Sequence, residues 1–169
     1  ERIIKGFTFL KRHPLLMVFG VSSFMPFVGI LLTNFYLIPE YVHKHLKESG
    51  DVFGAYEGYF ALGSLMAGLF IHRIFEGVSK VRAIAFLSVM IGGAFVTHFF
   101  NSNLLVFYIV AVVMGLCNAG IRILRVTYFF NHISNQIIGR TSSVFFSINV
   151  LFRLLFTACF AMPFFAQGN

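Results

Sequence analysis

Charged residues are scarce in this chain of 169 residues. They make up 11% of it, whereas a soluble domain has about 25%. Hydrophobic residues make up 58%. So few charges cannot cover a water-facing surface, which argues against an ordinary soluble domain and predicts an integral membrane protein.

Acidic residues and cysteines are rarer still, at 6 and 2 residues. Cys117 and Cys159 lie in apolar runs, where a free cysteine behaves as a small hydrophobe, so no disulfide is predicted. Walker, HExxH, GxSxG and CxxC patterns are absent from the sequence, so we expect neither an enzyme nor a cofactor. His43 and His45 share a loop without a further ligand at a suitable spacing, so we expect no metal site.

The net charge of +7 does not indicate nucleic acid as a partner. The basic residues lie in clusters between long apolar runs, rather than along one polar face. That pattern is typical of membrane topology. The chain begins at Glu1 and shows no leader with a cleavage site, so we expect a fragment of a longer protein.

Five apolar runs are long enough to cross a bilayer, which takes roughly 20 residues of helix. Lipid excludes open strands and nothing alternates with period two, so we predict an all-α membrane bundle. A basic amphipathic lead-in is expected at residues 1–14, with spans at about 15–38, 52–71, 83–100, 104–128 and 142–165. Small residues on the spans, Gly63 with Gly68 and Gly92 with Gly93, are expected to permit close helix approach.

The loops predict an orientation. Basic residues gather in the lead-in and around the loops after the second and fourth spans: Arg2, Lys5, Lys11, Arg12, Arg73, Lys80, Arg82, Arg125 and Arg140. The opposite loops contain only Lys44 and Lys47. The positive-inside rule therefore predicts a cytoplasmic N-terminus and a C-terminal tail outside.

Arg153 stands out inside the last apolar run. It follows Arg140, the expected membrane boundary, by 13 residues, which places it roughly 20 Å deep at 1.5 Å per residue. Asn149 and Thr157 lie one turn to either side on the same face. A charge at this depth is costly, so it is expected to face the bundle interior. Its guanidinium would bind an anionic solute there, or pair with a carboxylate of a segment outside this chain.

Other polar residues of the spans are weaker candidates. Arg122, with Asn118 one turn before it, is a second candidate for the solute cavity, whereas snorkelling explains Arg125. Glu57 is the only acid inside a predicted span, which makes it a candidate for proton coupling. The alternative is an ordinary acid in the first turns of its helix.

Three stretches lie in register with these spans: IKGFTFLKRHPLL at 4–16, GLFIHRIFEGVSKVR at 68–82 and NQIIGRTSSVFFSIN at 135–149. They resemble, in turn, the lead-in to the seventh helix, the cytoplasmic loop motif and the Gly-Arg start of the eleventh helix of major facilitator superfamily transporters. The loop-motif positions here are Gly68, His72 and Arg73, and the Gly-Arg pair is Gly139 and Arg140. His72 stands where the family motif has an acid.

The resemblance implies that the chain is the C-terminal half of a drug- or siderophore-exporter-like transporter, helices seven to eleven, without its last helix. It implies alternating access in a plasma or bacterial inner membrane, with the N-terminal half and membrane lipids as partners and protons as a candidate coupling ion. The surplus of buried arginine over acid indicates an anionic solute. The alternative is a truncated membrane scaffold or assembly subunit that transports nothing.

Overall fold

The computed structural model describes residues 2–160. They fall into two compact units, each treated by itself below. The described part of unit 1 comprises residues 2–32 and 130–160, and unit 2 comprises residues 33–129. Every regular element in the described residues is helical, which confirms the predicted all-α class.

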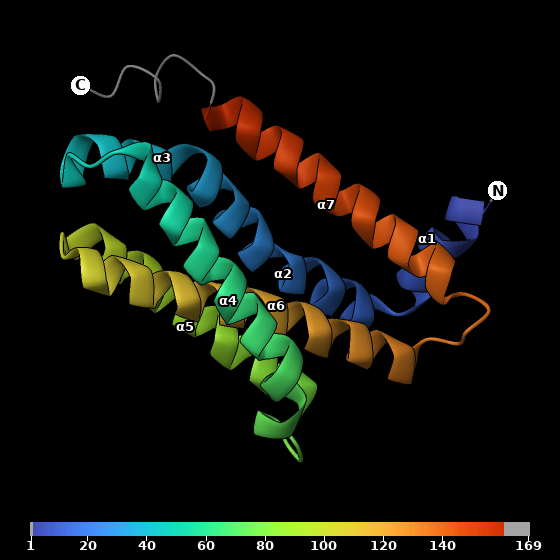
Figure 1. Ribbon diagram of the computed structural model, residues 1–169. Helices are drawn as coiled ribbons and strands as arrows, with labels where there is room; N and C mark the ends of the chain where they lie inside the picture. Colours follow the sequence, from blue (N-terminus) through green and yellow to red (C-terminus); the bar gives the residue numbers. More distant parts are fainter. Residues whose placement is uncertain (1, 161–169) are drawn as a thin grey trace. The chain divides into compact units, whose positions relative to one another are not determined.

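Unit 1 is built around the last described helix. It contains α1 (Arg2–Arg12), α2 (Pro14–Leu32) and α7 (Ile138–Phe160), and both α1 and α2 pack against α7 (Figure 1). Glycines make the approach close. A Cβ on Gly6 would lie 2.7 Å from the carbonyl oxygen of Arg140, and one on Gly20 would lie 2.1 Å from the ring of Phe145. The lead-in helix α1 therefore packs closely against the first turn of α7.

Unit 2 begins with the outer part of a long helical stretch. It comprises η1 (Thr33–Leu37), α3 (Ile38–Tyr41) and η2 (Val42–Leu46), followed by α4 (Gly50–Ile74), α5 (Lys80–Phe100) and α6 (Leu104–His132), which ends in unit 1. The first span was predicted to end at residue 38, whereas the helical stretch continues from Pro14 to Leu46. Pro39 does not break the helix, and it lies at the start of α3, directly after the π-helical turn η1. The stretch ends at Lys47, whose backbone is left-handed with φ 54°.

The close approach of α4 and α6 organises unit 2. A Cβ on Gly63 would lie 2.0 Å from the carbonyl oxygen of Val112, and one on Gly115 would lie 2.0 Å from that of Phe60. The hydroxyl of Ser64 donates to the carbonyl of Gly115 at 3.2 Å. The predicted role of Gly63 in close helix approach is therefore confirmed.

The other predicted contact glycines do not have this role. An added Cβ on Gly68, Gly92 or Gly93 meets nothing within 4 Å among the described residues. The prediction was wrong for these three, because a small residue on a span is necessary for close approach but does not say which face meets a neighbour.

An aromatic cluster closes one end of unit 2. Its buried core consists of Ile38, Val42, Tyr56, Phe107 and Ala111. The rings of Tyr41 and Phe107 stack with centroids 5.9 Å apart. The hydroxyl of Tyr41 donates to the carbonyl of Asn101, which joins α3 to the turn between α5 and α6.

We expect Tyr41→Phe to lower the free energy of unfolding by about 1 kcal/mol, because it removes this hydrogen bond and leaves the stacking in place. Thermal unfolding of the purified protein in detergent measures the change. Tyr36→Phe is the matched control, since Tyr36 is exposed and has no hydrogen bond in the described part of the chain. Equal melting temperatures for wild type and Tyr41→Phe would contradict the role assigned to the bond.

Four helical stretches, not the predicted five, are long and apolar enough to span a membrane. Among the described residues they are Pro14–Leu46, Lys80–His98, Leu104–His132 and Ile138–Cys159. The difference is α4, which has 25 residues and is therefore long enough. Its glycines, its tyrosines and Glu57 lower its mean hydropathy below that of the others. The chain is thus an all-helical, multi-pass membrane protein with four candidate spans.

Candidate functional site

Of the polar stripe predicted on the last span, Asn149 is buried on α7, whereas Arg153 and Thr157 are half-buried. Thr141, Phe145 and Asn149 follow one another at four-residue intervals and are 0%, 1% and 4% exposed. Arg153 continues this stripe and is half-buried. The opposite side of the helix presents exposed leucines, among them Leu151. Arg153 therefore lies on a different face of its helix from the exposed Leu151.

Asn149 carries an unused hydrogen-bond donor. Its side-chain Nδ2 is buried and has no partner among the described residues. Within the same residues, Arg153 forms neither a hydrogen bond nor an ion pair. A buried donor left unpaired costs about 1–3 kcal/mol, so it is rarely kept without a use. The two side chains together offer amide and guanidinium N–H groups, which bind acceptors.

The two arginines of α6 are arranged differently from the expectation. Arg122, the predicted cavity residue, is exposed, and Asn118 one turn before it is half-buried. Arg125 is only 6% exposed and interacts within the protein. Snorkelling therefore does not account for Arg125. The missed signal is periodicity, because Arg125 continues the buried face of Cys117 and Ile121, and Arg122 lies off that face.

Glu57 has one polar partner that sequence reasoning missed. The side-chain Nδ2 of Asn34 donates to Oε1 of Glu57 at 3.0 Å. Asn34 comes from η1, a π-helical turn of a kind often found at functional sites. The Oδ1 atom of the same amide is buried without a donor among the described residues. The partners are 23 residues apart, and no sequence pattern predicts that pairing.

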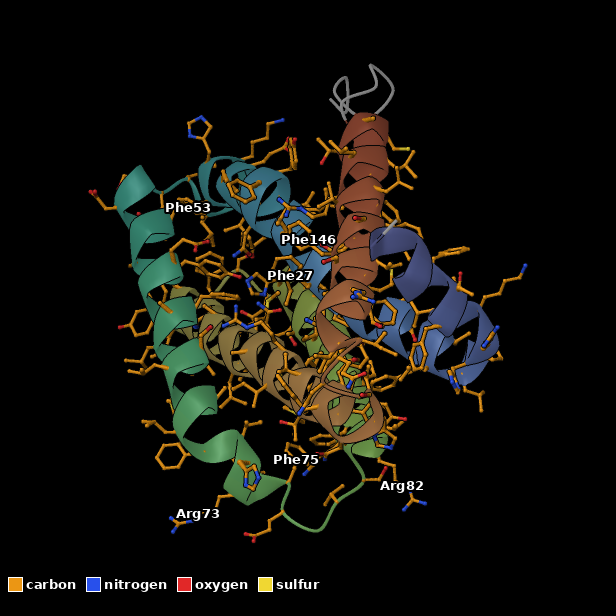
Figure 2. The ribbon with its side chains drawn as sticks, turned by 90° about the vertical axis from the view of Figure 1, so that its right-hand side faces the viewer. Phe27, Phe53, Arg73, Phe75, Arg82 and Phe146 are labelled. Atoms are coloured by element: carbon orange, nitrogen blue, oxygen red, sulfur yellow. The ribbon has the colours of Figure 1, made fainter. Side chains whose placement is uncertain are left out.

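The loop-motif residues are exposed. Gly68, His72 and Arg73 lie along the last turns of α4, and none of them is buried. Figure 2 shows Arg73 and Arg82 near the loop that joins α4 to α5, with Phe75 between them. The ammonium of Lys80 donates to the carbonyl of Phe75 at 3.4 Å, and Gly77 turns the chain with φ 76°. This basic loop lies at one end of unit 2.

The Gly-Arg pair lies in the first turn of α7. Gly139 is exposed and Arg140 is half-buried. Gly6 of α1 lies close to the carbonyl of Arg140, as described above. The pair therefore marks the point at which α1 meets α7.

The described candidate residues form two groups on different units. Asn149 and Arg153 belong to unit 1, and Glu57, Asn118 and Arg122 belong to unit 2. Within unit 2, the amide of Asn34 reaches Glu57 directly. Comparisons with family models, with curated proteins and with solved structures find no match for this chain.

Proposed function

We propose that this chain is part of a secondary transporter of the major facilitator type, which moves a small anionic solute by alternating access. The observation that carries the proposal is the unpartnered, buried Nδ2 of Asn149, one helical turn from Arg153. Four candidate spans and the motif resemblance of α1, the α4–α5 loop and the start of α7 agree with this assignment.

The chemistry of these two side chains favours an anion. An arginine guanidinium offers five N–H donors in a planar fork and no acceptor, a geometry that matches a carboxylate or phosphate. The amide of Asn149 adds a donor at a position 4% exposed, where water competes poorly. A solute with acceptor oxygens would use both groups, whereas a cationic solute would be repelled by Arg153.

The test is Asn149→Leu, which keeps the branched shape of the side chain and removes its donor. Without solute, we expect this variant to gain about 1 kcal/mol of stability, because a buried unpaired donor is lost. Uptake of radiolabelled succinate, lactate and phosphate by the complete protein in vesicles is expected to fall about tenfold for whichever probe the wild type transports. Thermal unfolding with and without that probe measures both effects.

Asn131→Leu is the matched control, because Asn131 is exposed and also belongs to unit 1. It should change neither stability nor flux. A lower melting temperature for Asn149→Leu together with unchanged flux would mean that the amide serves packing alone, and would remove the observation on which transport rests. Absence of flux for every anionic probe in the wild type would favour the membrane-scaffold alternative.

A further inference from the structure

The contact between Asn34 and Glu57 combines one hydrogen bond with one unused acceptor. The amide N–H of Asn34 reaches Oε1 of Glu57 at 3.0 Å, while the amide Oδ1 is buried without a donor. A primary amide and a protonated carboxylic acid form two bonds at once: the amide N–H donates to the acid carbonyl, and the acid O–H donates to the amide oxygen. The second bond requires one proton.

We propose that Glu57 and Asn34 form a proton-binding site, in which a proton taken from water resides on Oε2 of Glu57 and is donated to Oδ1 of Asn34. Binding forms one O–H bond and changes the carboxyl from charge −1 to neutral. Release returns the proton to water and involves no redox step. The inference rests on the proposed transport function, for which it supplies the coupling ion.

The titratable side chains beside Glu57 on α4 are those of Tyr56 and Tyr59. The ring of Tyr56 contacts that of His98 on α5, which also contacts Tyr41 on α3, and the ring of Tyr59 contacts that of Tyr108 on α6. The charged residues on and next to η2 are Lys44, Lys47, Glu40 and Glu48, and its titratable histidines are His43 and His45. Lys44 pairs with Glu40 at 2.8 Å.

A proton fits this site better than a metal ion. Hard cations such as Ca²⁺ take six to eight oxygen ligands. Here one carboxyl and one amide face each other, and no group of three or more His, Cys, Asp or Glu gathers among the described residues. A proton needs only one donor atom and one acceptor.

Proton binding would also add a second hydrogen bond between η1 and α4. Asn34 lies in the π-turn η1, and Glu57 lies in the second turn of α4. With Glu57 charged, one hydrogen bond joins η1 to α4, and Oδ1 of Asn34 has no donor among the described residues. With Glu57 protonated, two bonds join them. Proton uptake therefore strengthens the contact between η1 and α4, so the protonation state of Glu57 would affect the structure.

The test is infrared difference spectroscopy of the purified chain during a pH titration, with the proton itself as the probe. In the wild type we expect a carbonyl band of a protonated carboxylic acid that appears on acidification and is lost in Glu57→Gln. Glu57→Gln is expected to fold, because a glutamine amide can make both bonds to Asn34. Glu48→Gln is the matched control, since Glu48 is exposed, and it should retain the band.

Asn34→Leu then tests where the proton lies. It removes both partners of the acid, so the Glu57 band should move to higher wavenumber. A second measurement needs no substitution: with isotope-labelled asparagine in the wild type, proton uptake should lower the frequency of one asparagine carbonyl. This readout stays valid even if Asn34→Leu folds poorly.

Three results would overturn the proton site: no acid band lost in Glu57→Gln, no shift of the asparagine carbonyl, or a pH effect that sodium chloride abolishes. The last would indicate a metal cation instead. These spectra do not depend on solute flux. Proton uptake without anion transport would therefore refute the proposed function alone, and anion transport without the acid band would refute this site alone.

Discussion

Replacing Arg153 with alanine is expected to lower anion flux by about 100-fold at solute concentrations below saturation. The reason is the loss of two charge-assisted hydrogen bonds, each of which contributes about 1.5 kcal/mol or more. Their sum, about 3 kcal/mol, corresponds to a factor of about 100. Arg153 is half-buried on the face of α7 that carries Asn149, so little else on that helix would compensate.

Two further variants make this test specific. Arg153→Lys keeps the charge and loses the planar fork of donors. Its flux should therefore be about tenfold higher than that of Arg153→Ala. Arg82→Ala removes an equal charge from an exposed position and should leave flux unchanged. The measurement is initial uptake into vesicles by the complete protein, over a range of concentrations of the transported anion.

The competing explanation predicts another pattern. If Arg153 only paired with a carboxylate of another segment, alanine would leave that partner charged and buried, at a cost of about 3–5 kcal/mol in stability. The melting temperature would then fall steeply, and anion would not protect the wild type against heat. Protection of the wild type by the anion, and its loss in Arg153→Ala, separates a solute site from a structural ion pair.

Adding one methyl group at Gly63 or Gly115 is expected to destabilise the protein by about 3 kcal/mol. In each case the new Cβ would lie 2.0 Å from a carbonyl oxygen of the facing helix. Backbone atoms cannot rotate aside, so α4 and α6 would have to separate and lose the packing between them. The bond from Ser64 to the carbonyl of Gly115 would stretch as well.

Two other glycines of α4 serve as controls, because their replacement by alanine should not lower the stability. Gly58 and Gly68 lie on α4 and would meet nothing within 4 Å with an added Cβ. Alanine has a better helix propensity than glycine by about 1 kcal/mol, so Gly58→Ala and Gly68→Ala should be neutral or stabilising. Thermal unfolding of the four variants in detergent measures the contrast. Equal melting temperatures across all four would show that α4 and α6 are not in backbone contact.

Apolar periodicity predicted much of the helical framework. The predicted spans at 83–100 and 104–128 match α5 and most of α6. The placement of Asn149 on the buried side of the last span also follows from position, because residues four apart share a helical face. These features depend on the local sequence alone. The prediction of one further span at α4 was wrong, because a run interrupted by Tyr56, Glu57 and Tyr59 is long without being sufficiently apolar.

Features that depend on tertiary contacts were not predictable in this way. The helix continues past Pro39 into a segment with His43 and Lys44, although polar residues and proline suggest a loop. Two of its turns are π-helical, and no residue type in the sequence predicts that geometry. The bond between Asn34 and Glu57 likewise depends on the way η1 meets α4 in space.

The close packing of α1 against α7 has a mechanical consequence. At Gly6 no side chain separates the two backbones, so no rotamer change can absorb a displacement of one helix relative to the other. α7 is continuous from Ile138 to Phe160 and carries Asn149 and Arg153 along its length. Any axial displacement of α7 would therefore act directly on the backbone of α1, which links the lead-in to the helix that bears the candidate anion site.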